Sequence, residues 1–244
     1  MSFIADTSAV YCNGLGTGVY KQGKFRYRIG LRKKFESLRQ IDMAFTVRDH
    51  YFQKAKKEHF LARAYYKLEE IQKKYRILRA GHRVLDLGAF PGSWIQLAVA
   101  AVGPSGLVVG IDLKPIEHPF PKNVITFQGD IFDADFVETA LRDHLPFDVV
   151  LSDMAPSTSG VKVADSARSA LLFERAFRIA DTVLKPGGTF LAKIFQGSEF
   201  HQLLSEAKKR YQQTRVVKPE ASRKQSKEIY ILALSQKNRQ QEVF

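Results

Sequence analysis

A short glycine-containing segment is the first feature that could hold a ligand. The apolar run Val84-Leu85-Asp86-Leu87 continues into Gly88-Ala-Phe-Pro-Gly92, and a helix-like pattern follows from Ser93. Glycines let a ligand approach the backbone closely, and the N–H groups at the start of a helix can bind it. The dinucleotide fingerprint G-x-G-x-x-G is missing, so a pyrophosphate site is not indicated. We expect Gly88 and Gly92 to border a ligand of another kind.

Three aspartates indicate what that ligand is. Asp86 lies in the first apolar run, Asp112 ends the second, and Asp130 follows the third. The Asp86 carboxylate would repel a pyrophosphate but suits an ammonium group, and Asp112 is placed to accept hydrogen bonds from a ribose diol. Asp130 could accept from an adenine amino group. A single strand-end aspartate often only caps the next helix, but the three together with the glycine loop favour S-adenosylmethionine, a zwitterion with a sulfonium cation.

These residues need a sheet that brings strand ends to one edge. Short runs rich in Val, Ile, Leu and Phe alternate with segments of helical spacing, which predicts an α/β fold with a mostly parallel, seven-stranded sheet and helices on both faces. The Lys185-Pro-Gly-Gly188 segment is interpreted as a helix end before a strand. The expected strands are 84–87, 107–111, 124–127, 149–151, 189–194, 214–217 and 229–234, and the expected helices are 93–102, 134–144, 165–184 and 199–211.

The N-terminal third has a different character. A basic helix is predicted over 53–74, and before it apolar residues alternate with Arg26, Arg28 and Arg32, which indicates a strand with one cationic face. Gly14, Gly16 and Gly18 are interpreted as a turn, since no apolar strand precedes them. We therefore expect a basic N-terminal extension over 1–50, a ligand-binding domain over 51–235 and a polar tail over 236–244.

The net charge of +13 is unevenly distributed along the 244 residues. Residues 1–83 carry +12, residues 84–200 carry −5 and residues 201–244 carry +6. Two basic ends of this strength indicate a polyanionic partner, and nucleic acid is the leading candidate. The acidic middle is unsuited to phosphate, so it is expected to hold the cofactor.

Composition excludes several other classes. A content of 45% hydrophobic and 26% charged residues is that of a globular chain, and no apolar run approaches the roughly 20 residues of a membrane span. The single cysteine, Cys12, cannot form an internal disulfide, and no signal peptide is recognisable, so the cytoplasm is the expected compartment. The histidines are scattered without ligand spacing, so no metal is expected.

Five ordered motifs between about residues 58 and 235 resemble the FtsJ/RrmJ family of RNA ribose 2′-O-methyltransferases. The resemblance implies a Rossmann-like class I methyltransferase fold, S-adenosylmethionine as cofactor, and a catalytic tetrad of Lys67, Asp153, Lys193 and Glu228. It also implies cofactor contacts at Gly92, Trp94, Asp112, Asp130 and Asp153, in addition to Asp86 and Gly88 above. The motifs are Ala62-Arg-Ala-Tyr-Tyr-Lys-Leu68, Asp86-Leu-Gly-Ala-Phe-Pro-Gly92, Ser152-Asp-Met-Ala-Pro156, Lys193-Ile-Phe-Gln-Gly197 and Ser226-Lys-Glu-Ile-Tyr230.

The residue types of the tetrad suit methyl transfer to a hydroxyl group. Burial beside a cation favours the neutral form of an amine, so Lys193 is the candidate base, although it could act only as an electrostatic support. Asp153 could orient the Lys193 amine, Lys67 could hold the ribose or its phosphate, and Glu228 could position Lys67. Ser93 stands where the family usually has a second glycine, a departure that should leave the Gly92 backbone contact intact.

The expected substrate is RNA. A compact core without an appended domain resembles the bacterial type that acts on a uridine of 23S rRNA in the large ribosomal subunit. A tRNA anticodon-loop ribose is the first alternative, and a noncatalytic RNA-binding ribosome-assembly protein is the second. A nicotinamide-dependent reductase is disfavoured by the missing fingerprint. We expect a monomer that uses neither a membrane nor a metal.

Overall fold

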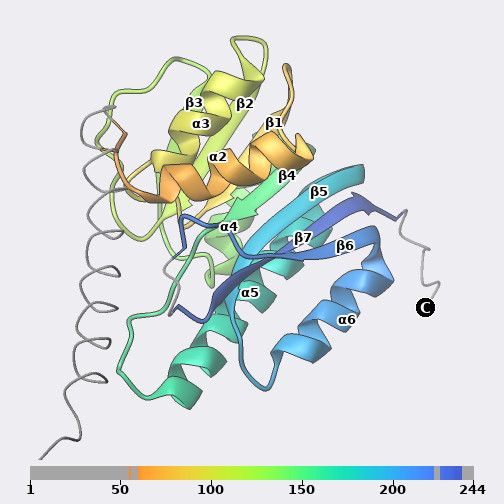
Figure 1. Cartoon of the computed structure of the whole chain (residues 1–244). Helices are drawn as coiled ribbons and strands as arrows, with labels where there is room; N and C mark the ends of the chain where they lie inside the picture. The colour runs from red at the N-terminus through yellow and green to blue at the C-terminus, as the bar shows by residue number, and fades with distance from the viewer. Residues whose placement is uncertain (1–54, 56–59, 223–225, 238–244) are drawn as a thin grey trace, which may run out of the picture. The chain divides into compact units, whose positions relative to one another are not determined.

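The computed structural model describes residues 55, 60–222 and 226–237 (Figure 1). The expectations about residues 1–54, namely the glycine turn and the cationic strand around Arg26 and Arg32, lie outside the described residues, as does most of the expected polar tail.

The centre of the fold is one seven-stranded sheet with the order β3-β2-β1-β4-β5-β7-β6. The pairs β3-β2, β2-β1, β1-β4 and β4-β5 are parallel, whereas β7 is antiparallel to both of its neighbours. The predicted mostly parallel seven-stranded sheet is therefore confirmed. The strands are β1 (Arg83–Leu87), β2 (Leu107–Asp112), β3 (Val124–Gln128), β4 (Phe147–Ser152), β5 (Leu184–Phe195), β6 (Tyr211–Val217) and β7 (Glu228–Gln236).

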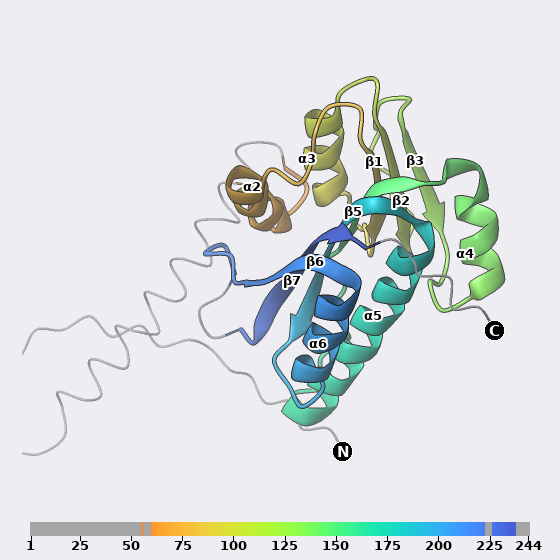
Figure 2. The same cartoon turned by 90° about the vertical axis from the view of Figure 1, so that its right-hand side faces the viewer.

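Helices cover both faces of this sheet, as predicted (Figure 2). Side chains of α2 and α3 share a buried cluster with Val84, Leu191 and Tyr230, while side chains of α4, α5 and α6 share another with Leu85 and Phe190. Because both faces are buried, the central strands are apolar on both sides. No described helix is both long and apolar enough to cross a membrane. The helices are α2 (Ala64–Tyr75), α3 (Ser93–Val102), α4 (Ala134–Leu141), α5 (Lys162–Val183) and α6 (Phe200–Arg210).

The prediction of one continuous helix over 53–74 is wrong. Helix α2 begins at Ala64, and residues 60–63 are not helical. The backbone N–H of Leu61 donates to Oε1 of Gln96 at 2.9 Å, and the indole Nε1 of Trp94 donates to the carbonyl of Ala64 at 2.8 Å. Contacts with α3 therefore fix the chain just before α2, which a helical charge pattern could not reveal.

The start of β5 also differs from the prediction. The strand was expected at Thr189, but it begins at Leu184, which pairs with Phe147. The pairing of β4 with β5 changes register between Phe147 and Val149. At this point β5 contains the Pro186-Gly187-Gly188 segment as extra residues within the strand. Gly187 has φ +79°, a conformation that glycine adopts readily. The Pro-Gly-Gly segment is thus a strand irregularity instead of a loop between α5 and β5.

We predict that Phe190→Ala lowers the free energy of unfolding by about 3–5 kcal/mol, because a large buried ring is replaced by a cavity. Phe190 is 0% exposed, and its ring centroid lies 5.5 Å from those of Phe173 and Phe177. Urea unfolding measures the change. Leu171→Ala on the exposed face of α5 is the control, since Leu171 is 57% exposed. Equal urea midpoints for the two variants would contradict the buried packing of the Phe190 ring.

Candidate active site

Strand direction brings three of the four tetrad residues to one edge of the sheet. Ser152 at the end of β4 is paired with Ala192, so Asp153 directly follows β4 beside Lys193 of β5. Strand β7 runs in the opposite direction, and its first residue, Glu228, is paired with Phe195 at the end of β5. The start of β7 and the ends of β4 and β5 therefore meet at the same place.

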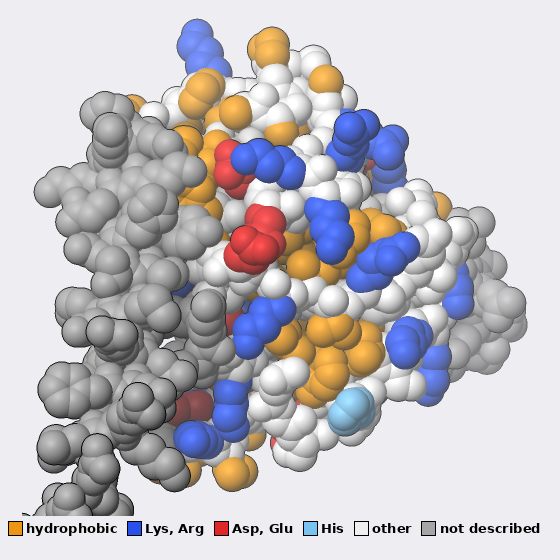
Figure 3. Space-filling model, viewed as in Figure 1, with side chains coloured by type: hydrophobic (Ala, Val, Ile, Leu, Met, Phe, Trp, Pro, Cys, Tyr) orange, Lys and Arg blue, Asp and Glu red, His pale blue; other side chains and the backbone are white. Residues whose placement is uncertain are grey.

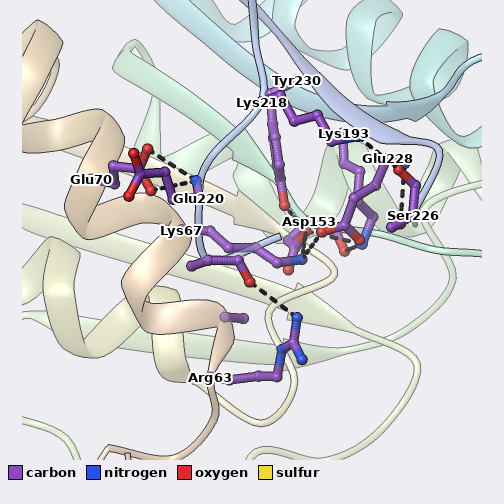
Figure 4. Close-up of polar contacts among 12 residues, drawn as sticks. Arg63, Lys67, Glu70, Asp153, Lys193, Lys218, Glu220, Ser226, Glu228 and Tyr230 are labelled. Carbon is purple, nitrogen blue, oxygen red and sulfur yellow. Dashed lines mark hydrogen bonds and ion pairs between the residues drawn. The ribbon is translucent and has the colours of Figure 1, made fainter. Parts of the chain in front are cut away.

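Helix α2 supplies the fourth residue. Leu68 and Ile71 are buried against the sheet and hold the helix down, and Lys67 on the same side is only 6% exposed. Figure 4 shows the Lys67 side chain extending from α2 toward the carboxylates of Asp153 and Glu228. A long flexible side chain is thus confined by packing on one side and by charge on the other.

The four side chains form an alternating series of charges. The Lys67 Nζ lies 2.8 Å from Oε1 of Glu228 and 3.8 Å from Oδ1 of Asp153. The Lys193 Nζ lies 2.9 Å from the same Asp153 oxygen and also donates to the backbone carbonyl of Asp153. The order Glu228, Lys67, Asp153, Lys193 thus places each positive charge next to a negative one. The structure brings together all four residues of the predicted tetrad.

Tyr230 is a fifth member of this site, and no role for it was predicted from the sequence. Its hydroxyl donates to Oδ1 of Asp153 at 2.6 Å, and the Lys67 Nζ lies 5.8 Å from its ring centroid. Tyr230 is paired with Lys193 across β5 and β7. Side chains two residues apart in a strand share a face, so its spacing from Glu228 was the signal that could have identified it.

The carboxylates of the site are held in their charged form. Burial by itself raises the pKa of Asp153, but the charges of Lys193 and Lys67 and the hydrogen bond from Tyr230 outweigh it, so this pKa is below its usual value. Burial also opposes ionisation of Glu228, and its contact with Lys67 again lowers the pKa. Burial and the nearby Asp153 carboxylate raise the pKa of the Tyr230 hydroxyl. Asp153 and Glu228 are consequently weak bases.

The glycine loop passes close to the segment that follows Asp153. Gly88 has φ +79°, and a Cβ there would lie 2.3 Å from Cγ of Met154. Gly92 has φ +105°, and a Cβ there would lie 2.8 Å from Cζ of Phe120. Neither position can carry a side chain without displacement of a neighbour. The backbone of the loop is therefore packed closely against Met154 and Phe120 at the point where α3 begins, and the first N–H groups of a helix have no partner within it.

Asp86 precedes this loop in β1 and is a buried carboxyl without a hydrogen-bond partner among the described residues. It is 1% exposed, and neither carboxylate oxygen has a hydrogen-bond partner in the described part of the chain. Burial, followed by the charges of Asp153 and Asp112, raises its pKa well above the usual value. A buried carboxyl without a partner is costly unless it is protonated or meets a donor. Asp86 is thus suited to receive an ammonium group from a ligand.

Two further aspartates lie at the ends of β2 and β3. The Asp112 carboxylate accepts from the backbone N–H groups of Phe90 and Lys114, both at 2.9 Å, which fixes it at the edge beside the glycine loop. Each of its oxygens keeps a second lone pair for a ligand hydroxyl. Asp130 is exposed and accepts from the N–H of Phe132 at 2.9 Å.

The Trp94 side chain has a structural role. Its indole is 2% exposed and donates to the backbone of Ala64, as described above, so it connects α3 to the start of α2. A contact of Trp94 with a cofactor would therefore use its backbone N–H at the start of α3.

This set of groups fits S-adenosylmethionine. Asp86 is a carboxyl without a hydrogen-bond partner among the described residues, which suits an ammonium group. Asp112 beside the glycine loop suits a ribose diol, and Asp130 beyond β3 suits an amino group. A phosphate at this edge would meet the carboxylates of Asp86, Asp112 and Asp153, and the described glycine loop, residues 88–92, contains no Lys or Arg. The described residues contain no group of three or more His, Cys, Asp or Glu side chains that could hold a metal ion.

A sheet of this order, with a glycine loop and carboxylates at the ends of β1 to β3, defines a Rossmann-like class I methyltransferase. The chain belongs to the FtsJ-like methyltransferase family, whose sequence profile matches residues 60–236. It is 63% identical over 192 residues to the ribosomal RNA large subunit methyltransferase E of Syntrophobacter fumaroxidans, which covers 79% of this chain and 98% of that relative. The family assignment made from the motifs is thereby confirmed.

Two more distant relatives support the same family assignment. The ribosomal RNA large subunit methyltransferase E of Bdellovibrio bacteriovorus is 44% identical over 198 residues, covering 80% of this chain and 100% of the relative. A crystal structure of a Plasmodium falciparum protein, provisionally described as a ribosomal RNA methyltransferase, matches with a TM-score of 0.65 at 29% identity. That match covers 74% of this chain and 100% of the other.

The raised pKa of Asp86 predicts a pH effect on stability. A carboxyl whose pKa is higher in the folded than in the unfolded state stabilises the fold below its unfolded pKa, and this contribution is lost as the pH rises through the folded value. Asp86→Asn removes that loss. We therefore expect the thermal midpoint of Asp86→Asn, relative to the unaltered protein, to increase as the pH rises from about 5 to 8 in the absence of ligand.

Thermal unfolding at several pH values measures this difference. Asp143→Asn at an exposed position after α4 is the control and should show no such trend. Parallel pH profiles for Asp86→Asn and the unaltered protein would show that Asp86 does not titrate abnormally.

Proposed function

We propose that this protein transfers a methyl group from S-adenosylmethionine to the 2′-hydroxyl of a ribose in RNA, and that its target is a uridine of 23S rRNA in the large ribosomal subunit. The observation that carries the proposal is the alternating series Glu228, Lys67, Asp153, Lys193 at the edge of a methyltransferase fold. The names of the relatives favour the large subunit, and the basic ends of the chain suit an RNA partner.

The cofactor would be held by Asp86, the backbone of Gly88, Gly92 and Trp94, and the carboxylates of Asp112 and Asp130. When bound, S-adenosylmethionine supplies an electrophilic methyl group on a sulfonium cation. The negative charge of Asp153 lies between this region and the tetrad lysines, so it favours a cation on one side and orients an amine on the other. Its lowered pKa keeps this charge in place at neutral pH.

The tetrad prepares the ribose hydroxyl for attack. Asp153 and Glu228 are weak bases, and Lys67 contacts both of these carboxylates, so it serves to hold them and the ribose or its phosphate. Lys193 contacts one carboxylate and one neutral carbonyl. We assign to Lys193 the removal of the 2′-hydroxyl proton. For this role the Lys193 amine would first give up the proton that it carries in its ion pair with Asp153, a loss that burial beside a bound sulfonium cation would favour. The neutral amine would then accept the proton of the 2′-hydroxyl, and the bound cofactor would supply the methyl group to the hydroxyl oxygen.

We predict that the protein labels large-subunit rRNA when it is incubated with methyl-labelled S-adenosylmethionine and separate pools of ribosomal subunits, free rRNA and tRNA. The labelled nucleotide should resist alkali, because a methylated 2′-oxygen cannot attack the neighbouring phosphate. Label in tRNA alone would transfer the assignment to an anticodon-loop ribose. Cofactor binding without label in any RNA pool would favour a noncatalytic assembly protein.

Variants of Lys193 test the mechanism in the same assay. Lys193→Met should lower the rate by at least about 10²-fold, the usual contribution of a general base, while S-adenosylmethionine still raises the thermal midpoint. Lys193→Arg keeps the charge but cannot give up a proton at neutral pH. Activity in Lys193→Arg would support a purely electrostatic role. An unchanged rate in Lys193→Met would exclude both roles.

We also propose that residues 1–50 form a basic extension that binds RNA outside the active site, that residues 51–235 form the methyltransferase domain, and that 236–244 form a polar tail. The charge of the N-terminal segment supports the first assignment. Replacing Arg26, Arg28 and Arg32 with Ala in the full chain should weaken RNA binding and make its dependence on log salt concentration shallower by about 2–3 units.

Binding measured by fluorescence anisotropy over a range of salt concentrations tests this prediction. The matched control removes three positive charges elsewhere, at Lys122, Arg142 and Arg178. An unchanged salt dependence in the arginine variant would rule out the extension as an RNA clamp.

A further inference from the structure

Exposed charges are distributed unequally between the two ends of the sheet. Near β3 and α4 the exposed surface is mainly acidic, whereas near β6, the end of α6 and the end of α2 it is mainly basic. In Figure 3, Lys and Arg side chains spread over the face that carries α2, β6 and α6, with few acidic side chains among them. The exposed acidic residues of the first end are Glu117, Asp130, Asp133, Asp135, Glu138 and Asp143.

The two regions also differ in ion pairing. Just after α4, the Arg142 Nη2 lies 3.1 Å from Oε1 of Glu138, four residues earlier. On α5, the Arg178 Nη2 lies 2.6 Å from Oε1 of Glu174, one helical turn earlier. In the segment from the last turn of α2 to β1, in the last turn of α6 and within β6, six exposed cations have no carboxylate within ion-pair distance among the residues that the structure describes. We call these six the basic flank: Lys74, Arg76, Arg79, Lys208, Lys209 and Arg215.

Helix dipoles explain only part of this arrangement. Lys74, Lys208 and Lys209 lie in the last turns of their helices, where cations are favoured. Arg79 lies in the turn before β1, and Arg215 lies in the edge strand β6, so neither benefits from a helix end. Unpaired like charges on one surface repel each other. Their gathering in one place therefore indicates an anionic partner.

The basic flank continues the surface next to the tetrad. Val217 of β6 is paired with Tyr230, and Arg215 is paired with Leu232 two residues further along β7, on the face that α2 covers. Glu70 of α2 accepts the backbone N–H of Glu220 just beyond β6, so this side of α2 lies against the β6 end of the sheet.

Lys74 is one turn further along α2 than Glu70 and two turns beyond Lys67, hence on the same side of the helix. Cations thus follow both α2 and β6 away from the active site.

We propose that the basic flank is the path of the RNA segment adjoining the target ribose, which enters the active site from the side of α2 and β6 while the acidic end near β3 and α4 stays free of RNA. This inference rests on the proposed function, because it takes RNA as the substrate. Exposed lysines and arginines without a carboxylate partner among the described residues are available to phosphates, whereas the acidic end would repel them.

Charge reversal at the two ends provides a matched test. One variant carries Lys74→Glu, Lys209→Glu and Arg215→Glu, and the control carries Lys122→Glu, Arg142→Glu and Arg178→Glu, so both have the same net charge. We expect the flank variant to bind rRNA at least about tenfold more weakly at about 0.1 M salt, with a salt dependence shallower by about 2–3 units. The control should stay within about twofold of the unaltered protein.

Two results would overturn the inference. One is an equal loss of rRNA affinity in both variants, since only total charge would then matter; the other is unchanged rRNA binding by the flank variant. Thermal unfolding with and without S-adenosylmethionine checks that both variants fold and bind the cofactor. If the Glu variant does not fold, Lys74→Gln, Lys209→Gln and Arg215→Gln decide by the same criteria. If the unaltered protein methylates no RNA, the proposed function itself fails; if it does and the flank variant matches it, only the RNA path is wrong.

Discussion

The alternation of charge among Glu228, Lys67, Asp153 and Lys193 is the constraint on which the rest of the structure depends. Removing charged groups from water is costly, and the loss of one partner from a buried pair leaves an uncompensated charge. The four side chains come from α2, the end of β4, β5 and the start of β7. Sheet order, strand direction and the packing of α2 must therefore all be correct before the charges balance.

Asp153 connects the two halves of the site. Toward β1 and β2 it belongs with Asp86 and Asp112, whose carboxylates suit a cationic ligand, and it contributes to the raised pKa of Asp86. Toward β5 and α2 it is the shared partner of two lysines. One carboxylate thus marks the boundary between a region suited to the methyl donor and a region suited to the acceptor. Its pKa stays low because the lysines outweigh burial.

Much of the fold could be predicted because the central strands are apolar on both faces, and the grouping of Lys67, Asp153, Lys193 and Glu228 could be predicted because five motifs occur in a recognisable order. Three features could not. The start of α2 depends on contacts with Trp94 and Gln96 of α3, which lie far away in the sequence. The early start of β5 depends on a register shift against β4. The role of Tyr230 requires its register opposite Lys193, because a tyrosine in an apolar strand otherwise looks like part of the core.

The position of β7 between β5 and β6 affects the order in which the chain can be completed. Among the described strands β6 pairs with β7 alone and is made before it, so β6 has no partner in the sheet until β7 has been synthesised. The same strand supplies Glu228 and Tyr230. During synthesis Lys67, Asp153 and Lys193 are therefore present well before their remaining partners. The pairing of β6 and the completion of the charge series therefore occur together, late in synthesis, when β7 joins the sheet. A chain that ends before β7 has neither a paired β6 nor a complete charge series.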